Sequence, residues 1–458
     1  MLKEKSKEGA KESLFGTDGI RALAGEYPLT AEGVRKIGFA AGKIFQGKSG
    51  AKPSWIIGRD TRESGNWIER ALTEGLREGG CDVFSCGVIP TSAVSVIMRE
   101  KNFSGGAAVS ASHNPPEFNG IKFFSRGGLK FSGSFEAEIE KNVAEEGHSA
   151  LPGEEADMIE NFPEAQLMYA RFLKKNLPDD FSLRGMKLVV DCANGSASCI
   201  APELLGSLGA DIIAIHNGPN GKNINLKCGA THPGSMQKEV LKSGAFGGVT
   251  FDGDADRVFF ADEKGSLMDG DALLGVAAAH LKEQNKLPNN CVVATVMANL
   301  GLLNGLKKLD IKTVVTSVGD RSVAEGMAAN GAVLGGEQSG HIIFGGLLPT
   351  GDGLLTALQI LNIVAGKKQK LSYFNGLFPK YPQVLLNVKV GKKTPVRELP
   401  EFQSLIKASE ARLGENGRIL VRYSGTEPLL RIMVEGRYDA LIKEIAGTLA
   451  DAAKKELA

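Results

Sequence analysis

One pattern occurs three times along the chain: an apolar strand, a polar loop, an amphipathic helix and a second strand. It starts at Trp55, at Met186 and at Cys291, and in the first case the helix NWIERALTEGLREGG carries apolar residues at helical spacing before two glycines end it. Strands that alternate with helices in this way favour parallel sheets covered by helices. The sequence therefore predicts three similar mixed α/β domains, with functional loops at the ends of strands.

The C-terminal part of the sequence departs from this pattern. LLNVKV, GRILVRYSG and LLRIMVEG predict antiparallel strands, and ALIKEIAGTLADAAKKEL predicts a terminal helix. We expect a smaller α+β domain there, so that four domains surround a central cleft. The expected domain boundaries are 1–153, 154–258, 259–372 and 373–458.

Length and composition agree with several globular domains. The chain has 458 residues, more than the roughly 250–300 that one hydrophobic core supports. Charged residues make up 23% and the net charge is +1, so no nucleic acid partner is expected. The six cysteines form no CxxC pair, which favours a reducing compartment over a zinc or disulfide framework. Because we find neither a signal peptide nor an apolar run of membrane-spanning length, we expect a cytoplasmic protein without a membrane partner.

The segment GKIFQGKS (42–49) matches the G-x-x-x-x-G-K-[ST] pattern of nucleotide-binding loops. Such a loop binds phosphate where a strand enters it and a helix leaves it. Here the apolar spacing from Val34 to Phe45 predicts a helix before the motif, and a strand follows it. We therefore interpret the match as coincidental, and a nucleotide-dependent enzyme is the less favoured class.

The stretch GGVTFDGDADRVFFAD carries Asp252, Asp254 and Asp256 at alternate positions. On an extended backbone, this alternation turns all three carboxylates to one side. Carboxylates that close repel one another unless a divalent cation joins them, and Mg²⁺ prefers oxygen ligands. A solvated acidic turn and an EF-hand loop are the alternatives. Glu263 stands at the twelfth position of an EF-hand, but Arg257 at the sixth and the strand-like flanks oppose that interpretation.

A polar loop with two prolines interrupts two apolar runs in VSASHNPPEFNGIKFF (109–124). Ser112 lies there beside His113, the prolines restrict the chain, and the Asn-Gly pair at 119–120 predicts a turn. Taken alone, the simplest interpretation is a capping serine in a surface loop, and the stretch shows no catalytic triad.

Two further loops carry groups suited to sugar phosphates. GGEQSGH (335–341) offers a carboxylate, a hydroxyl and an imidazole, which suit sugar hydroxyls. RYSGTEPLLR (422–431) offers hydroxyl, backbone N–H and guanidinium donors to a phosphate. A hairpin with salt-bridged arginines is the alternative for the second loop.

Together and in this order, FGTDGIR, SASHNPPEFNGIK, DGDADR, GGEQSGH and RYSGTEP resemble the motifs of the α-D-phosphohexomutase superfamily. The resemblance extends over nearly the whole chain from Phe15 onward, and the motifs are highly specific as a set. It implies four domains that carry, in chain order, a phosphoserine loop, a metal-binding loop, a sugar-binding loop and a phosphate-binding loop.

The resemblance implies an isomerase that moves a phosphoryl group within a sugar phosphate. SASHN, GEQSGH, ATHPGSMQ and RYSGTEP are most similar to the branch that interconverts glucosamine 6-phosphate and glucosamine 1-phosphate for UDP-N-acetylglucosamine synthesis. The alternatives are a mutase of glucose or mannose phosphates and, in another class, a sugar-phosphate binding protein or a phosphatase. The implied cofactors are Mg²⁺ and glucosamine or glucose 1,6-bisphosphate. The oligomeric state is left open, with a homodimer as one alternative.

Functional residues of the superfamily have counterparts at matching positions of this sequence. Ser112 matches the serine that carries the phosphoryl group, and the resemblance implies that it holds Mg²⁺ together with Asp252, Asp254 and Asp256. The positions that assist proton transfer or stabilise charge are Arg21, Lys122, Arg257 and His341. The positions that match substrate-binding residues are His113, Glu337, Ser339, Arg422, Ser424, Gly425, Thr426 and Arg431.

Two expectations concern the metal loop. Ala255 stands where the superfamily usually has glycine, which predicts a small change in the loop backbone. Three aspartates and a serine phosphate exceed the charge of one Mg²⁺, so Arg21, Lys122 and Arg257 are expected to offset the surplus.

Overall fold

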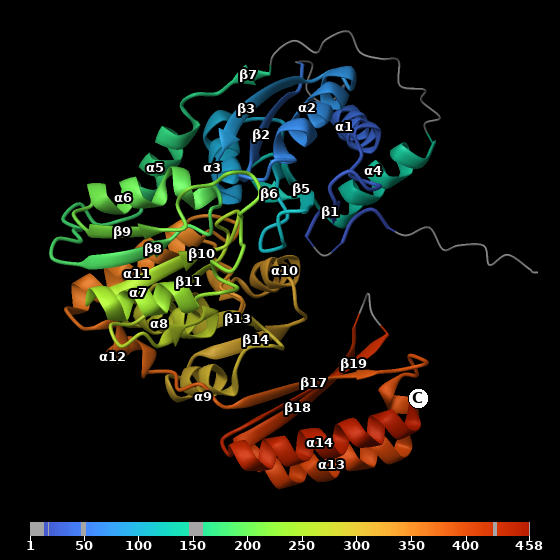
Figure 1. The fold of residues 1–458 in the computed structure, drawn as a ribbon, viewed down its shortest axis with the longest axis vertical. Helices are drawn as coiled ribbons and strands as arrows, with labels where there is room; N and C mark the ends of the chain where they lie inside the picture. Colours follow the sequence, from blue (N-terminus) through green and yellow to red (C-terminus); the bar gives the residue numbers. More distant parts are fainter. Residues whose placement is uncertain (1–12, 17, 47–51, 146–158, 425–427, 458) are drawn as a thin grey trace, which may run out of the picture. The chain divides into compact units, whose positions relative to one another are not determined.

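The fold is that of a computed structural model, and the structure describes residues 13–16, 18–46, 52–145, 159–424 and 428–457 (Figure 1). The chain divides into two compact units. The larger comprises Met1–Met297 with Asp310–Leu377, and the smaller comprises Ala298–Leu309 with Phe378–Ala458. Three sheets belong to the larger unit and one to the smaller.

The first sheet has the strand order β1-β5-β4-β2-β3-β7, with β6 beside β5. Its parallel strands are β2, β3, β4 and β7, and β5 runs antiparallel between β1 and β4. Helices α1, α2 and α4 share a core with one face, and α3 packs against β2 and β4 from the other (Figure 1). The elements are β1 (Ile20–Leu23), α1 (Ala31–Phe45), β2 (Ser54–Arg59), α2 (Gly65–Glu78), β3 (Asp82–Val88), α3 (Thr91–Lys101), β4 (Gly105–Val109), β5 (Phe118–Ser125), β6 (Leu129–Lys130), α4 (Gly133–Glu145) and β7 (Glu160–Asn161).

The helix before GKIFQGKS is confirmed. α1 begins after Thr30, whose side chain accepts a hydrogen bond from Gly33 N, and it ends at Phe45 inside the motif. A helix therefore enters this segment and β2 follows it, which is the reverse of a phosphate-binding loop. Residues 47–49 of the segment lie outside the described residues.

The second sheet has the order β12-β11-β10-β8-β9, in which β8, β9 and β10 are parallel and β11 is antiparallel to β10. Because β11 and β12 complete its edge, this sheet continues beyond the boundary expected at residue 258. β7 likewise adds a strand to the first sheet beyond residue 153. The elements are α5 (Ala165–Lys175), β8 (Lys187–Asp191), α6 (Ala201–Ser207), β9 (Asp211–Ile215), α7 (Gly234–Ser243), β10 (Gly247–Phe251), β11 (Val258–Ala261) and β12 (Leu267–Met268).

The third sheet has the order β14-β13-β15-β16, with β16 antiparallel to β15. Each of the three sheets of the larger unit thus combines parallel strands with antiparallel pairing toward one edge, and the predicted mixed α/β character is confirmed. The elements are α8 (Gly270–Glu283), β13 (Cys291–Thr295), β14 (Lys312–Thr316), α10 (Asp320–Asn330), β15 (Leu334–Gly336), β16 (Ile342–Phe344), α11 (Gly353–Lys367) and α12 (Leu371–Asn375).

The smaller unit is the predicted α+β domain. Its antiparallel sheet has the order β17-β19-β18, and its two long helices share one core with the sheet (Figure 1). Alternate residues of β19 enter that core, as expected for a strand with one buried face. The elements are α9 (Leu300–Lys308), β17 (Gln383–Lys389), α13 (Pro400–Leu413), β18 (Gly417–Tyr423), β19 (Leu429–Gly436) and α14 (Asp439–Glu456).

Helix α9 groups with this C-terminal unit, although the sequence predicted it as part of the third α/β domain. Two glycines on the helix explain the difference. A side chain at Gly301 would lie 1.9 Å from the carbonyl oxygen of Pro379, and one at Gly305 would lie 2.4 Å from the Phe378 ring. The absence of side chains lets the segment before β17 pack closely on the helix.

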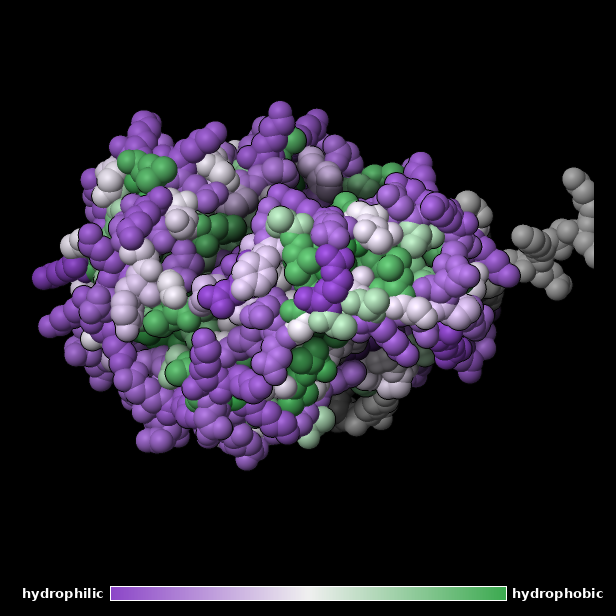
Figure 2. Space-filling model, turned by 90° about the horizontal axis from the view of Figure 1, so that it is seen from below, coloured by the Kyte–Doolittle hydropathy of each residue, from purple (hydrophilic) through white to green (hydrophobic). Residues whose placement is uncertain are grey.

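One face of the molecule is largely hydrophilic. Figure 2 shows hydrophilic side chains over most of the face seen there, with hydrophobic residues in small separate groups. Small exposed apolar groups of this kind are ordinary on a globular protein. Within the described part of the chain, none of the helices combines the length and the apolar character needed to cross a membrane.

A capping carboxylate of α11 makes a pH-dependent contribution to stability. Asp352 Oδ1 accepts hydrogen bonds from Leu355 N at 3.0 Å and from the Tyr169 hydroxyl at 2.8 Å, and the residue is 1% exposed. Burial raises the pKa of Asp352 from 3.8 to about 6. Because the folded pKa is the higher one, the stabilising protonated form is complete below pH 3.8 and is lost as the pH rises through about 6.

We expect Asp352→Asn to remove this dependence, since asparagine still caps the helix but does not ionise. The free energy of unfolding of wild type relative to Asp352→Asn should fall by about 2–3 kcal/mol between pH 4 and pH 7 in urea titrations. Asp269→Asn, which replaces the carboxylate that caps α8, controls for the capping change. Parallel pH profiles of wild type and Asp352→Asn would contradict the assignment.

Candidate active site

Ser112 lies in the loop between β4 and β5 and is fully buried. Its hydroxyl donates a hydrogen bond of 2.6 Å to Asp252 Oδ2, and His113 Nδ1 lies 3.4 Å from Ser112 Oγ. The backbone of Ser112 is left-handed, with φ of 52°, which side-chain-bearing residues rarely adopt. The serine is therefore not a solvent-exposed cap, because its oxygen faces a carboxylate from the second sheet.

The turn predicted at Asn119-Gly120 is wrong. Both residues belong to β5, which pairs with β1 and β4 on its two sides. A side chain at Gly120 would lie 2.6 Å from the carbonyl oxygens of Ile20 and Ser110, so glycine is needed for close strand packing and not for a turn. Lys122 still reaches Asp254 and Asp256, because the strand itself carries it there.

The three aspartates come together as predicted, but the loop is not extended. Asp252, Asp254 and Asp256 are buried, and each offers a carboxylate oxygen within 4.8 Å of the others. The loop between β10 and β11 turns, and Ala255 has a φ of 57°. The carboxylates converge through this turn rather than through alternation. A left-handed position also explains why glycine suits the site occupied by Ala255.

The EF-hand alternative is excluded by the same loop. Strands β10 and β11 flank it and pair antiparallel with each other. Glu263, at the twelfth position, accepts hydrogen bonds from the backbone N–H of Ser372 at 3.1 Å and from its hydroxyl at 2.5 Å. That carboxylate is therefore occupied elsewhere.

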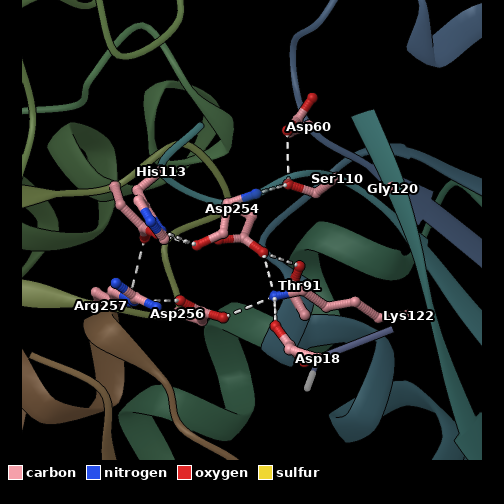
Figure 3. A network of polar contacts seen from close by, with 12 residues as sticks. Asp18, Asp60, Thr91, Ser110, His113, Gly120, Lys122, Asp254, Asp256 and Arg257 are labelled. Atoms are coloured by element: carbon pink, nitrogen blue, oxygen red, sulfur yellow. Dashed lines mark hydrogen bonds and ion pairs between the residues drawn. The ribbon is translucent and has the colours of Figure 1, made fainter. Parts of the chain in front are cut away.

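Lys122 is the cation at the centre of the site. Its Nζ lies 2.9 Å from Asp254 Oδ2, 2.9 Å from Asp256 Oδ2 and 3.0 Å from Asp18 Oδ2, and Figure 3 shows it between these carboxylates. Burial acts to lower the pKa of Lys122, but the three carboxylates raise it well above its usual value. The side chain is therefore an ammonium ion at neutral pH.

The two predicted arginines occupy different positions. Arg257 Nε lies 3.8 Å from Asp256 Oδ1, whereas Arg21 contacts Asp18 at 2.7 Å rather than the triad. Asp18 is a fourth carboxylate that motif reasoning missed, although it lies within the quoted FGTDGIR segment. It also contacts Lys130, at 2.5 Å, so a second unforeseen charge adjoins the site.

The electrostatics of the triad suit a cation. Burial and repulsion by Asp256 and Asp254 raise the pKa of Asp252 well above its usual value. Burial also acts to raise the pKa of Asp256. The charges of Lys122, His341 and Arg257 nevertheless hold the pKa of that carboxyl below its usual value. The Oδ1 atoms of Asp254 and Asp256 are buried and accept no hydrogen bond from the described residues. These oxygens fit the oxygen ligands that a hard divalent ion prefers.

Thr91, at the start of α3, orients one member of the triad. Its hydroxyl donates a 2.8 Å hydrogen bond to Asp254 Oδ2, and its backbone N–H donates one of 3.1 Å to Asp254 O (Figure 3). Helix α3 of the first sheet thus contacts the loop of the three aspartates directly. No sequence motif marked this threonine.

The GGEQSGH segment forms the hairpin between β15 and β16. Glu337 Oε1 accepts a 3.0 Å hydrogen bond from Gly319 N, and the Ser339 hydroxyl makes no hydrogen bond with the described residues. His341 is buried, pairs through its backbone with Arg257, and has two ring nitrogens without a hydrogen-bond partner in the described chain. This hairpin therefore joins His341 to the loop of the three aspartates.

Both histidines of the site are neutral at pH 7. Burial lowers the pKa of His341, with Asp256 opposing the change. Burial and the nearby Arg257 and Arg21 lower the pKa of His113 to about 4. Neutral imidazoles can accept a proton, unlike the Lys122 ammonium.

The predicted phosphate loop lies in the smaller unit. Arg422 on β18 stands directly opposite Arg431 on β19, and Ser424 Oγ accepts a hydrogen bond from Arg431 at 3.5 Å. Lys393, which sequence reasoning missed, donates a 2.7 Å hydrogen bond to Ser424 O. Like charges opposite each other are unfavourable unless an anion joins them. Gly425 and Thr426 lie outside the described residues.

A second group with metal-ligand chemistry is structural. Asp191, His216 and Cys228 offer atoms within 4.8 Å of one another. Both oxygens of Asp191 already accept backbone hydrogen bonds, from Ala193 N at 2.9 Å and Gly229 N at 3.1 Å. Burial raises the pKa of the Cys228 thiol to about 12.

Comparison with known protein families assigns the chain to one of them. Domains of the description phosphoglucomutase/phosphomannomutase match it in order, with alpha/beta/alpha domain I at residues 12–150, domain II at 168–265, domain III at 269–381 and the C-terminal domain at 385–452. Fold and site thus define a phosphohexomutase, an enzyme of the isomerase class. The chain belongs to the phosphoglucomutase/phosphomannomutase family.

Curated relatives that match nearly the whole chain include two phosphoglucosamine mutases. The chain is 43% identical to the phosphoglucosamine mutase of Syntrophotalea carbinolica over 449 residues, which cover 98% of each chain. It is 45% identical to that of Carboxydothermus hydrogenoformans over 436 residues, which cover 94% of this chain and 97% of the relative.

Solved structures share the fold. A phosphoglucomutase/phosphomannomutase family protein from Burkholderia thailandensis aligns with a TM-score of 0.78 at 24% identity, over 97% of this chain and 98% of that one. An Aspergillus fumigatus N-acetylphosphoglucosamine mutase, solved with GlcNAc-6P and magnesium, aligns with a TM-score of 0.64 at 20% identity, over 96% and 95%.

Proposed function

We propose that the protein is a phosphoglucosamine mutase, which interconverts glucosamine 6-phosphate and glucosamine 1-phosphate for the synthesis of UDP-N-acetylglucosamine. The observation that carries this proposal is the similarity to curated phosphoglucosamine mutases, 43% and 45% identical over nearly the whole chain. The buried Ser112 beside three aspartates supports a mutase that uses a serine phosphate.

Ser112 is the proposed phosphoryl carrier. The free 1- or 6-hydroxyl of the bound monophosphate attacks the phosphorus on Ser112 Oγ. An oxygen–phosphorus bond to the sugar forms, the Oγ–phosphorus bond breaks, and a proton moves from the sugar hydroxyl to the serine oxygen. The resulting 1,6-bisphosphate turns round and returns its other phosphoryl group to Ser112. Glucosamine or glucose 1,6-bisphosphate would load the serine at the start.

Asp252, Asp254 and Asp256, with the serine phosphate, would hold Mg²⁺. The buried oxygens of Asp254 and Asp256 without hydrogen-bond partners among the described residues support this assignment. When bound, the ion supplies positive charge against the phosphoryl oxygens.

Lys122, Arg21 and Arg257 would stabilise the remaining negative charge, with Arg21 acting through Asp18. The Lys122 ammonium is held by carboxylates on three sides and cannot accept a proton. The neutral His341, with no hydrogen bond from its ring to the described residues, is the better proton acceptor. Phosphoryl transfer depends mainly on such positioning and charge.

Recognition of the substrate would involve the remaining loops. Glu337, Ser339 and His113 would bind sugar hydroxyls or the amino group. The placement of Arg422 and Arg431 opposite each other on neighbouring strands supports binding of the phosphate that does not react. Each of the four domains would supply one loop, and Ser424, Gly425 and Thr426 complete the last.

A cytoplasmic location and a homodimer are further parts of the proposal. All six cysteines are free, which supports a reducing compartment. Sedimentation equilibrium of the purified protein would measure the oligomeric state, and fractionation of the source cells would test the location.

A substrate panel tests the proposed specificity. The kcat/KM for glucosamine 1-phosphate should exceed that for glucose 1-phosphate and mannose 1-phosphate by roughly 10- to 200-fold, because one group of the sugar distinguishes them. All three are measured with the same 1,6-bisphosphate and Mg²⁺. A preference for a neutral sugar would instead indicate a phosphoglucomutase or phosphomannomutase.

A further inference from the structure

The left-handed backbone of Ser112 needs support that does not involve its hydroxyl. The bond from Ser112 Oγ to Asp252 Oδ2 uses the hydroxyl proton. If Ser112 is the proposed carrier, that proton is absent whenever the oxygen bears a phosphoryl group. The conformation must then be held through the backbone in both states.

Arg62 provides this support from the loop between β2 and α2. The residue is 1% exposed, and its Nη2 donates hydrogen bonds to Ser112 O at 3.0 Å and to Asn114 O at 2.8 Å. Its Nη1 donates to Phe118 O at 2.8 Å and also to Pro115 O. One guanidinium thus binds four carbonyl oxygens of the serine loop, which uses its planar set of donors.

Asp60 connects Arg62 to the other side of Ser112. Its Oδ2 accepts hydrogen bonds from Arg62 Nε at 2.9 Å and from the Ser110 hydroxyl at 2.6 Å. The Ser110 oxygen in turn accepts a 2.9 Å hydrogen bond from Ser112 N, and Figure 3 shows Ser110 beside Asp60. Both the N–H and the carbonyl group of Ser112 are therefore tied to the Asp60–Arg62 pair.

Asn225 holds the same carbonyl groups from the loop after β9. Its Nδ2 donates to Ser112 O at 2.8 Å and to Asn114 O at 3.0 Å, the two oxygens that Arg62 Nη2 binds. Gly253 leaves room for the serine loop, because a side chain at this position would lie 2.6 Å from Ser112 O. Asn225 thus links the serine loop to the part of the chain that carries the aspartates.

We propose that Arg62, anchored by Asp60, and Asn225 are positioning residues that hold Ser112 in the left-handed conformation in which its oxygen faces Asp252. This inference rests on the proposed function of Ser112 as phosphoryl carrier. Neither side chain donates to Ser112 Oγ. Their bonds end on backbone oxygens, which remain when the serine gains or loses its phosphoryl group.

The test compares Arg62→Lys with Arg59→Gln. An ammonium cannot reach four carbonyl oxygens in a plane, so Arg62→Lys should lower kcat by about 10²-fold while KM changes less than about threefold. Arg59 lies three residues away and bonds Glu69 at 2.9 Å rather than the serine loop. Arg59→Gln should therefore keep kcat within about threefold of wild type.

Asn225→Ala gives a second test if Arg62→Lys folds poorly, with Asn223→Ala as its control. Asn223 lies in the same segment but donates to Gly218 O at 3.0 Å. Asn225→Ala should lower kcat by about tenfold without a matching rise in KM, since Arg62 still holds the two carbonyls, and Asn223→Ala should not. Circular dichroism and thermal unfolding report whether each variant is folded.

A third measurement separates this inference from the proposed function. Phosphate uptake from glucose 1,6-bisphosphate, followed by intact mass, reports on Ser112 whichever monophosphate the enzyme prefers. Uptake should slow in Arg62→Lys and Asn225→Ala but not in their controls. If uptake and kcat equal those of wild type in folded variants, or if the controls lose as much, the positioning role is wrong. If wild type takes up no phosphate on Ser112, the proposed function itself fails.

Discussion

Ser112→Ala is expected to reduce mutase turnover by at least about 10⁴-fold, because it removes the oxygen that would carry the phosphoryl group. The substitution is small, and the hydroxyl makes a single bond shorter than 3 Å, to Asp252 at 2.6 Å. We therefore expect a folded protein that fails in chemistry and still binds the substrate. Coupled assay of hexosamine phosphate turnover and equilibrium binding of the monophosphate measure the two effects separately.

Intact mass distinguishes this role from a merely structural one. Wild type incubated with a 1,6-bisphosphate should gain one phosphate, and Ser112→Ala should gain none. Ser125→Ala, which changes a serine at the end of β5 that bonds Leu129 O, is the matched control and should behave as wild type. Phosphate found on another residue in the Ser112→Ala protein would show that the carrier has been misassigned.

Asp252→Asn is expected to separate metal binding from folding. Asp252 is buried and repelled by Asp256 and Asp254, so a neutral side chain of the same shape should leave the stability of the metal-free protein unchanged or higher. Asparagine can still pair with Ser112 Oγ and with Arg257 N, which now bonds Asp252 Oδ1 at 3.2 Å. Turnover should nevertheless fall by roughly 10²- to 10³-fold, since a charged ligand for the ion is lost.

Thermal unfolding with and without Mg²⁺ provides the decisive comparison. At a concentration of 100 times its dissociation constant, a bound ion stabilises the folded state by about 2.7 kcal/mol. This increment should be present in wild type and much reduced in Asp252→Asn. Asp262→Asn, a buried carboxylate outside the triad that caps the turn before β12, serves as control and should retain it. An equal Mg²⁺ effect in wild type and Asp252→Asn would rule out the triad as the site.

Much of the site could be predicted because its groups lie in short motifs. The three aspartates are separated by one residue each, so any backbone that turns there brings them close. The prediction that their carboxylates converge was therefore correct, although the loop was wrongly assumed to be extended. The role of Ser112 was harder to predict from the sequence, because its hydrogen-bond partner Asp252 lies 140 positions away. Only the set of motifs in order made its role a specific hypothesis.

The support of the site could not be predicted because it depends on pairing over long distances. Arg62 and Asn225 bind the serine loop across 50 and 113 positions, and Asp18 meets Lys122 only because β1 and β5 lie side by side. The prediction of a turn at Asn119-Gly120 was wrong for the same reason. A local turn preference is weaker than the hydrogen bonds and packing that two neighbouring strands provide to β5.

The sequence by itself determined the alternation of strands and helices, the smaller C-terminal domain and the residue types of four loops, since periodicity and motifs act over a few positions. The tertiary structure decided which carboxylates share Lys122, how Ser112 is held and where α9 belongs. Burial is the physical reason. It strengthens charge interactions and makes each unpaired polar group costly, and burial exists only after distant segments pack together.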